Sequence, residues 1–376
     1  MQGAESEVRA FIVGDSIRSN SLGRVLSMAI SAEAVFAEVV VLAYDDGKPW
    51  SGAGQFGFDV TPFSRADIPG LAERIRRSAE ETATLLWVSK GADPMSHLAE
   101  ALEGTPALTI VADFDDNDVA IMRNFRSQSL MNRIKMHRLR RKHPARLERS
   151  QRRLARLADA LTFSNSALAQ TYRARLDASA KPWAIVPHSR RARKTAAHGR
   201  GPRHGGLVLG FIGTVRAHKG AAEIVELMRH DRNTTVVSFL QEWEPPGDCV
   251  AQWRTYPPST PLADLYDEID FLVLPMDGED EASLHQLPAK LVDAAVNGCP
   301  VMATPTPPIM EFAGSAVLTV ESWADTADVY RSLRSADVET LSREIRRSFE
   351  EAFSPLSTGT AIERMLSVGA NGEVGR

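Results

Sequence analysis

The chain has 376 residues, of which 43% are hydrophobic and 24% charged, and its formal net charge is −4 at pH 7. This length suits two domains, and the composition is that of a globular protein. No window approaches eighteen consecutive apolar residues and the N-terminus lacks the apolar core of a signal peptide, so we expect a cytoplasmic protein without a transmembrane segment.

The first half of the chain alternates short apolar runs with longer amphipathic ones. Nearly continuous apolar runs are typical of parallel strands buried on both faces, and the amphipathic runs are typical of the helices that cover them. The predicted strands are 8–14, 38–44, 84–89, 107–113 and 160–165, with 183–189 as a further candidate.

The alternation breaks in the segment 190–206, which is basic, rich in Gly, Ala and His, and without apolar periodicity, as expected of a flexible linker. Strands are predicted again at 207–213, 234–240, 270–276, 300–306 and 316–320. We therefore expect a Rossmann-like N-terminal domain over 1–189 and a second Rossmann-like domain over 207–350. A helical tail over 351–376 is able to pack on either domain, and we assign it to the N-terminal one.

The stretch GTVRAHKG, residues 213–220, places cations directly before the helical pattern AAEIVELMRH. Arg216 and Lys219 are unfavourable beside a helix start, where the dipole is already positive, unless an anion lies between them. In a doubly wound sheet this loop lies at the ligand-binding edge, so a bound phosphate is one interpretation and a solvated loop is the other. The P-loop pattern is absent, and no G-x-G-x-x-G directly follows a predicted strand.

The stretch HQLPAKLVDAAVNGCPVMAT, residues 285–304, resembles a signature of the family 4 glycosyltransferases. Members carry a strand, a glycine and a basic loop ending in Lys-Gly, followed later by two acids with seven residues between them. The second acid opens the pattern E-A-M-A-x-G-x-P-V-V-A-T, to which DAAVNGCPVMAT is similar, and GTVRAHKG is similar to the first motif. The resemblance covers most of 207–320. It implies the α/β GT-B fold, in which the parallel sheets of two Rossmann-like domains face each other across a cleft.

The resemblance also implies a donor site in the second domain. Arg216 and Lys219, with Gly213, would hold the donor diphosphate, and Asp293 would accept hydrogen bonds from the ribose hydroxyls. Lys290, one helical turn before Asp293, either reaches the nucleotide or only pairs with that carboxylate. We assign it to the nucleotide.

Two residues depart from the family pattern where the donor is held. His285 stands at the place of the first acid, and Thr214 stands where many members carry an arginine. His285 is either a candidate catalytic residue that hydrogen-bonds a sugar hydroxyl or a loop histidine without a role. Backbone amides of the loop before Pro288 would face the sugar and the phosphates. The loop residues assigned to the donor sugar are Ser283, Leu284, Gln286 and Leu287.

Two loops of the first domain are assigned to the acceptor side. The loop GDSIRSNSLGR resembles a small-residue loop of the family, and an ordinary strand-to-helix turn is the alternative. The stretch VADFDDND follows a predicted strand, where family members carry Asp or His near the transferred sugar. Metal binding and helix capping by Asp116 are the alternatives there. The candidate residues are Ser21, Gly23 and Arg24 in the first loop, and Asp113 and Asp115, named as catalytic, in the second.

The implied reaction is a retaining transfer from a nucleotide-diphosphate sugar, of hexosyl type, to a hydroxyl of a glycan, a lipid-linked or a small-molecule acceptor. Fixed cations and helix amides would stabilise the leaving diphosphate. No Asp-x-Asp stands at a strand end of the second half, and Cys249 and Cys299 lack metal-ligand spacing. We therefore expect no metal, no cofactor and free thiols. The alternatives are a non-catalytic GT-B binding or assembly protein and a GT-B nucleotide-sugar epimerase.

A basic segment runs from Arg133 to Arg156, with leucines at roughly helical spacing and Pro144 dividing it into two expected helices. It lacks a zinc motif, a helix-turn-helix and an aromatic stacking pattern, so nucleic acid is not an expected partner. A solvated helix face and a surface for anionic lipid or an anionic acceptor are both compatible with the pattern. The second interpretation implies peripheral contact with the inner face of the membrane.

Overall fold

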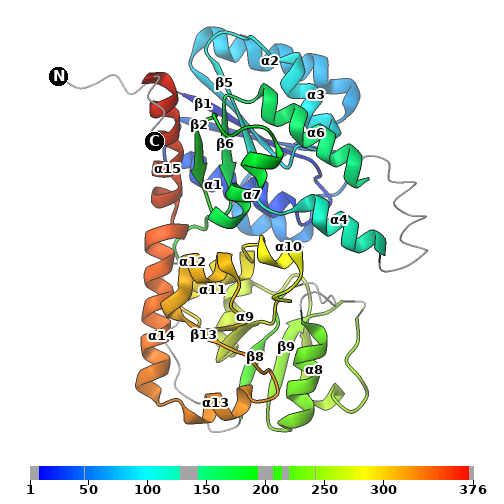
Figure 1. Cartoon of the computed structure of the whole chain (residues 1–376), viewed down its shortest axis with the longest axis vertical. Helices are drawn as coiled ribbons and strands as arrows, with labels where there is room; N and C mark the ends of the chain where they lie inside the picture. Colours follow the sequence, from blue (N-terminus) through cyan, green and yellow to red (C-terminus); the bar gives the residue numbers. More distant parts are fainter. Residues whose placement is uncertain are drawn as a thin grey trace, which may run out of the picture. The chain divides into compact units, whose positions relative to one another are not determined.

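The computed structural model describes residues 8–45, 47–127, 143–193, 206–213, 220–241 and 243–371. The chain divides into two compact units, of which the first is Met1–Ser189 with Pro355–Arg376 and the second is Arg190–Ser354. Each unit has a parallel sheet with helices on both faces (Figure 1). This arrangement confirms the predicted α/β class.

The sheet of the first unit has seven strands in the order β3-β2-β1-β4-β5-β6-β7. Neighbouring strands are parallel, and the register pairs Ser89 with Asp113, so the ends of β4 and β5 lie side by side. The strands are β1 (Arg9–Gly14), β2 (Glu38–Tyr44), β3 (Val60–Phe63), β4 (Thr84–Ser89), β5 (Leu108–Phe114), β6 (Ala160–Phe163) and β7 (Trp183–Ile185).

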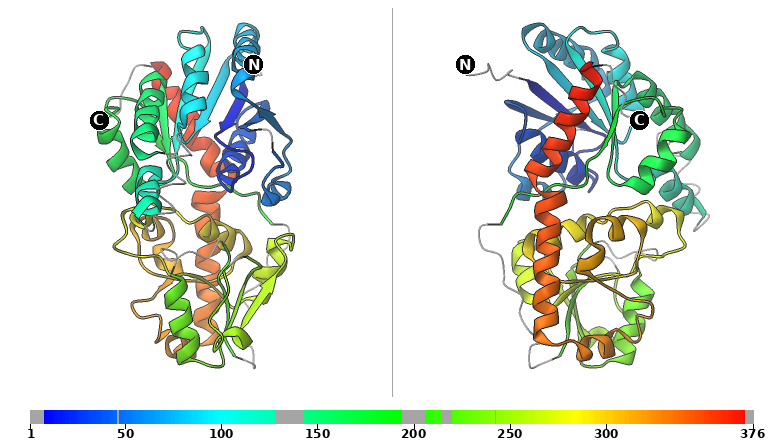
Figure 2. Two further views of the ribbon diagram at one scale, coloured as in Figure 1. Left: turned by 90° about the vertical axis from the view of Figure 1, so that its right-hand side faces the viewer. Right: turned by 60° about the vertical axis from the view of Figure 1, so that its left-hand side comes forward.

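Helices cover both faces of this sheet. One apolar core joins α2, α3, α6 and α7 to one face, and another joins α1 and α15 to the opposite face. Helix α15, red in Figure 2, contributes Ile362 and Met365 to the core that α1 also lines. The helices are α1 (Leu22–Glu33), α2 (Ile68–Glu81), α3 (Asp93–Ala101), α4 (Asp118–Ser127), α6 (Pro144–Leu157), α7 (Ser166–Arg175) and α15 (Pro355–Asn371), with the 3-10 helices η1 (Ser51–Phe56) and η2 (Arg65–Asp67).

The sheet of the second unit has six parallel strands in the order β10-β9-β8-β11-β12-β13. They are β8 (Val208–Gly210), β9 (Thr235–Phe239), β10 (Trp253–Tyr256), β11 (Phe271–Leu274), β12 (Val301–Ala303) and β13 (Val317–Thr319). The helices are α8 (Ala221–His230), α9 (Leu262–Glu268), α10 (Glu281–Leu284), α11 (Ala289–Asn297), α12 (Pro307–Ala313), α13 (Thr326–Ser332) and α14 (Ser335–Ser348), with the 3-10 helices η5 (Val250–Gln252) and η6 (Gly314–Ala316) and the π-helical turn η7 (Phe349–Phe353).

Two strands, β3 and β10, were not predicted from the sequence. Both lie at the edge of their sheet, and each has two exposed residues among its four. An edge strand pairs on one side only and does not need a continuous apolar run, and β3 even contains Pro62.

Several other expectations concern single segments. Helix α6 begins at Pro144, as predicted, whereas residues 128–142 of the basic segment lie outside the described residues. Both cysteines are free and buried, which confirms the expected thiols. Within the described ranges, no helix combines the length and apolar character needed to cross a bilayer.

Candidate functional site

Asp293 lies on α11 in the second unit, in a helix with clear sequence signals at both ends. Pro288 precedes the first helical residue, and Gly298 ends the helix in the left-handed conformation, at a φ of 63°. The apolar side chains of Leu291, Val292 and Ala294 bury the helix against the sheet. The helix therefore carries Asp293 into the protein interior, where the residue is 2% exposed.

The Asp293 carboxylate is held by two cations. Arg190 Nε donates to Oδ1 at 2.7 Å, and Lys290 Nζ donates to Oδ2 at 2.8 Å. Burial raises the pKa of this carboxyl group, but the charges of Arg190 and Lys290 outweigh burial and leave the pKa below its ordinary value. A carboxylate has about four lone-pair sites. Asp293 is therefore an ionised acceptor with capacity for further donors.

A second layer of contacts holds this ion pair network. The Tyr266 hydroxyl donates to the carbonyl oxygen of Lys290 at 3.2 Å, and Asn297 Nδ2 donates to the carbonyl oxygen of Asp293 at 2.7 Å. Burial, followed by the charge of Asp293, raises the pKa of Tyr266 well above its ordinary value, so the phenol stays neutral.

The first residues of the predicted linker are part of this site. Arg193 Nη1 donates to Asn297 Oδ1 at 2.9 Å, and Arg193 Nη2 pairs with Asp267 Oδ2 at 2.9 Å. Arg190 and Arg193 thus hold the segment 190–193 against α9 and α11. Residues 194–205 lie outside the described residues.

The loop assigned to the donor sugar contains the short helix α10. Asp280 caps it by accepting from Ser283 N at 3.0 Å and from Ser283 Oγ at 3.1 Å. Nδ1 of His285 lies 2.7 Å from the carbonyl oxygen of Glu281. The side chains of Ser283 and Leu287 are buried, whereas Leu284, His285 and Gln286 are half-buried.

The residues assigned to the donor diphosphate lie mostly outside the described part of the chain. Thr214, Arg216 and Lys219 belong to the segment 214–219, which joins β8 to α8. Its borders are Gly213, with a φ of 151°, and Gly220, with a φ of 76°. A Cβ on Gly220 would lie 2.1 Å from the carbonyl oxygen of Pro275, just beyond β11, so this border requires glycine.

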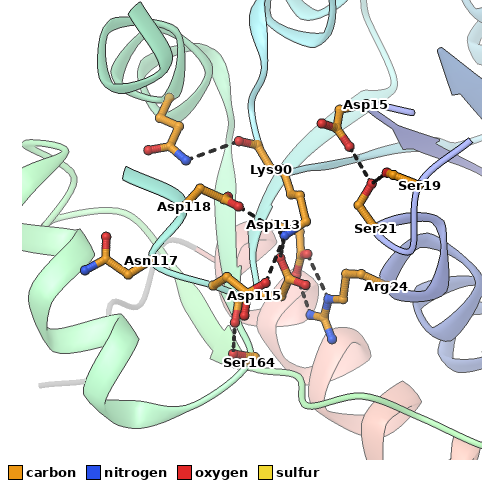
Figure 3. A network of polar contacts seen from close by, with 12 residues as sticks. Asp15, Ser19, Ser21, Arg24, Lys90, Asp113, Asp115, Asn117, Asp118 and Ser164 are labelled. Carbon is orange, nitrogen blue, oxygen red and sulfur yellow. Dashed lines mark hydrogen bonds and ion pairs between the residues drawn. The ribbon is translucent and has the colours of Figure 1, made fainter. Parts of the chain in front are cut away.

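In the first unit, Arg24 of α1 and Asp113 of β5 form a buried bidentate ion pair (Figure 3). Arg24 Nε donates to Oδ2 at 2.9 Å, and Nη2 donates to Oδ1 at 2.6 Å and to the Val186 carbonyl oxygen at 2.8 Å. Thr162 Oγ1 also donates to Asp113 Oδ1, at 2.8 Å. Asp113 has no exposed surface, so its contacts are with the protein interior.

Lys90, which directly follows β4, stands among three carboxylates. Its Nζ lies 2.6 Å from Asp115 Oδ1, 3.2 Å from Asp116 Oδ2 and 3.3 Å from Asp118 Oδ1. Figure 3 shows two aspartates directed at the lysine, Asp115 from the loop after β5 and Asp118 from the first position of α4. Lys90 has a positive φ of 66°, and Gln151 Nε2 donates to its carbonyl oxygen at 3.3 Å. We call these four side chains, Lys90, Asp115, Asp116 and Asp118, the Lys90 cluster.

Two carboxyl groups of the Lys90 cluster, those of Asp115 and Asp118, have raised pKa values. Burial raises the pKa of Asp115 to about 6 and that of Asp118 to about 7, although Lys90 opposes both shifts. Burial lowers the pKa of Lys90, but the surrounding aspartates outweigh it and raise that pKa well above the ordinary value. The lysine therefore stays charged, while the carboxyl groups of Asp115 and Asp118 titrate together.

The structure brings the two predicted acceptor loops to one edge of the first unit's sheet. Ser21 Oγ donates to Asp15 Oδ1 at 3.0 Å just before α1 begins, and Gly23 and Arg24 lie in the first turn of α1. The loop after β5 lies at the carboxyl ends of the strands, as the loop after β1 does.

Sequence analysis missed Lys90, Asp118, Arg190 and Ser164. Lys90 is a lone lysine in the sequence, and its only signal is its place directly after a predicted strand. Ser164 donates to the Asp115 carbonyl oxygen at 2.6 Å and has a similar position after β6. Among the residues that the structure describes, no group of three or more His, Cys, Asp or Glu side chains could hold a metal ion.

No protein-family model matches the sequence, and no curated protein sequence matches it either. The fold is similar to solved structures. HepE of Anabaena, in complex with UDP-glucose, has a TM-score of 0.64 at 13% identity, over 96% of this chain and 99% of HepE. Sucrose-phosphate synthase from Thermosynechococcus elongatus has a TM-score of 0.65 at 12% identity, over 97% of this chain and 99% of the synthase.

AviGT4, a glycosyltransferase involved in avilamycin A biosynthesis, has a TM-score of 0.58 at 14% identity, over 97% of this chain and 98% of AviGT4. With the two parallel sheets, these similarities identify the GT-B fold and confirm the fold predicted from the sequence. Membership of family 4 stays a prediction.

Proposed function

We propose that the protein is a glycosyltransferase that takes a sugar from a nucleotide-diphosphate sugar and transfers it to a hydroxyl acceptor. The observation that carries this proposal is the buried, ionised Asp293 on α11, at the position where the sequence resembles the ribose-binding acid of family 4 enzymes. The fold that the chain shares with HepE, whose structure contains UDP-glucose, supports the same donor class.

The donor site is assigned to the second unit. Asp293 accepts hydrogen bonds from the ribose hydroxyls, while Arg216 and Lys219 neutralise the diphosphate together with Gly213 and the amides at the start of α8. Charge grows on the leaving diphosphate as the glycosidic bond breaks, and fixed cations stabilise that charge without a metal. In this proposal the transfer retains the anomeric configuration, and a donor phosphate oxygen takes the acceptor proton.

The acceptor is assigned to the carboxyl edge of the sheet in the first unit. Asp118 Oδ2 meets no hydrogen-bond donor in the described part of the chain, and the Asp118 side chain is 16% exposed, so we assign an acceptor hydroxyl to this carboxylate. The Lys90 cluster sets the charge at this edge. Asp113 is inaccessible, and we give it a positioning role, in which it holds Arg24 in place.

The experiment is an incubation of the full chain with UDP-, GDP- and ADP-sugars, in which release of the nucleoside diphosphate is measured. Each donor is tested with and without a panel of acceptors. The same reactions are repeated with EDTA in excess. We expect release that an acceptor accelerates and that EDTA leaves nearly unchanged. Conversion of the donor without an acceptor would indicate an epimerase. Binding without any turnover would indicate a non-catalytic protein, and loss of activity in EDTA, restored by magnesium or manganese, would refute the metal-free mechanism.

A further inference from the structure

We propose that Arg190 is a positioning residue of the nucleotide site, which orients the Asp293 carboxylate toward the two ribose hydroxyls and so makes the site prefer ribonucleotides. This inference rests on the proposed function. The segment that carries Arg190 was expected to be a linker, so a role in the donor site adds a residue that the family resemblance does not supply.

Arg190 and Lys290 hold Asp293 in different ways. The Arg190 side chain is 15% exposed and uses Nε on Oδ1, whereas the Lys290 side chain is 27% exposed and extends from the same helix as Asp293. A lysine has a flexible stem and three rotatable donors, so it is able to turn toward a phosphate without leaving its helix. A planar guanidinium is the more rigid partner. Arg190 therefore fixes the carboxylate whether or not Lys290 stays on Oδ2.

The backbone of Arg190 is itself held in place. Its N–H donates to the carbonyl oxygen of Phe353 at 3.2 Å. Three residues later, Arg193 pairs with Asp267 on α9 and donates to Asn297 on α11. Asn297 in turn donates to the backbone carbonyl of Asp293. The two arginines thus hold the segment 190–193 at both ends, and a carboxylate held from such a support is preorganised for its ligand.

The hydrogen-bonding capacity of Asp293 matches a vicinal diol. Two of its roughly four lone-pair sites accept from Arg190 and Lys290. The other sites are able to accept from the 2′ and 3′ hydroxyls of a ribose. A ligand that lacks these hydroxyls leaves the remaining acceptor sites of a buried carboxylate without donors, and a site discriminates against such an analogue.

The test measures the affinity of the full chain, by calorimetry, for whichever of UDP, GDP and ADP binds and for its 2′,3′-dideoxy analogue. In wild type we expect the ribonucleotide to bind about tenfold to hundredfold more tightly than the analogue. Arg190→Met should bring that ratio close to one by weakening only the ribonucleotide. Arg190→Lys should restore part of it. Arg229→Met is the control because it removes an arginine of the same unit that pairs with Asp248 instead, and it should keep the wild-type ratio.

The pH dependence gives a second readout that a purely structural role would not change. Because Arg190 lowers the pKa of Asp293, its removal raises that pKa, and ribonucleotide affinity in Arg190→Met should be lost at a higher pH than in wild type. The other groups that face this carboxylate, Lys290 and Tyr266, are the same in both proteins, so a shift reports the loss of Arg190.

The outcomes separate this inference from the proposed function. If wild type binds none of the three nucleotides, the proposed function fails and the inference fails with it. If wild type binds one of them but Arg190→Met keeps the wild-type ratio and pH profile, only the inference is overturned. If Arg190→Met does not fold, Arg190→Lys decides, because it keeps the charge and changes the geometry. A wild-type ratio in Arg190→Lys would then overturn the inference.

Discussion

At the scale of single residues, Arg24 and Asp113 form a buried ion pair, and removal of either charge should lower the stability of the fold. Both side chains are essentially inaccessible, at 1% and 0% exposure. Arg24→Met leaves the carboxylate without its cation, so we expect a loss of about 3–5 kcal/mol in the free energy of unfolding, measured by urea denaturation. The double variant Arg24→Met, Asp113→Leu should recover part of that loss. A loss in Arg24→Met no larger than that of an exposed pair, about 1 kcal/mol or less, would contradict the described geometry.

Asp115 and Asp118 make the stability depend on pH. Their folded pKa values, about 6 and about 7, lie above the ordinary aspartate value of 3.8. Between about pH 4 and pH 7 the folded state therefore binds more protons than the unfolded state, and the free energy of unfolding falls as the pH rises through that window. We expect Asp118→Asn to reduce this fall, measured by urea denaturation at about pH 5 and pH 8.

The matched control for this prediction is Asp177→Asn, because the Asp177 side chain is 84% exposed. This variant should keep the wild-type pH dependence. If Asp118→Asn shows the same fall in unfolding free energy as wild type, Asp118 does not hold its proton in the folded state near neutral pH.

The sequence was informative about residues with a local pattern. Asp293 was found because a motif surrounds it, and Asp115 because it stands in a run of acids after a strand. Lys90 and Arg190 were missed because each gains its role from a partner far along the chain. Arg190 lies 103 positions from Asp293, and no spacing rule relates them.

At the scale of secondary-structure elements, α6 has a basic face opposite its buried one. Leu147, Gln151 and Leu154 are buried, and Arg152 and Arg153 pair with Glu148 and Glu100. Within the described part of the chain, three further arginines of this helix are exposed and have no carboxylate in an ion pair with them. They are Arg146, Arg149 and Arg156.

We expect these arginines to favour an anionic lipid surface. Replacing all three by Gln should weaken binding of the full chain to vesicles that contain phosphatidylserine by up to about 3 kcal/mol, since each basic residue contributes about 1 kcal/mol. Co-sedimentation with vesicles measures this, and vesicles of phosphatidylcholine alone are the lipid control. The same change at Arg229, Arg254 and Arg347 is the charge-matched protein control. Equal binding of both triple variants to the phosphatidylserine vesicles would contradict a lipid-binding role and indicate that the basic face of α6 is only a solvated surface.

Strands were predictable from the sequence where both of their faces are buried. Strands such as β4 and β5 are mostly apolar and were placed within one residue of their observed ends. The edge strands β3 and β10 were missed because their exposed positions carry polar or charged residues such as Thr61 and Arg254. Such residues are as compatible with a solvent-exposed loop as with an edge strand.

At the scale of the whole molecule, the alternation of strands and helices predicted two Rossmann-like domains, whereas the GT-B fold was implied by the resemblance to family 4 glycosyltransferases. The return of the chain to the first unit at Pro355 was harder to predict, because a helical tail with one apolar stripe is able to pack on any exposed core. Ile362 and Met365 of α15 complete the core beside α1, which explains why the last helix belongs to the first unit.

The most direct measurement is the affinity of a nucleoside diphosphate for the full chain, determined by calorimetry for wild type, Asp293→Asn and the control Asp248→Asn, whose side chain is half-exposed and pairs with Arg229. We predict that wild type binds one of UDP, GDP and ADP, that Asp293→Asn weakens it by about 1.5–3 kcal/mol, and that Asp248→Asn leaves it within about 0.5 kcal/mol. Circular dichroism of each variant confirms that it is folded. Wild-type affinity in folded Asp293→Asn, or no nucleotide binding by wild type, would contradict a donor site built around Asp293.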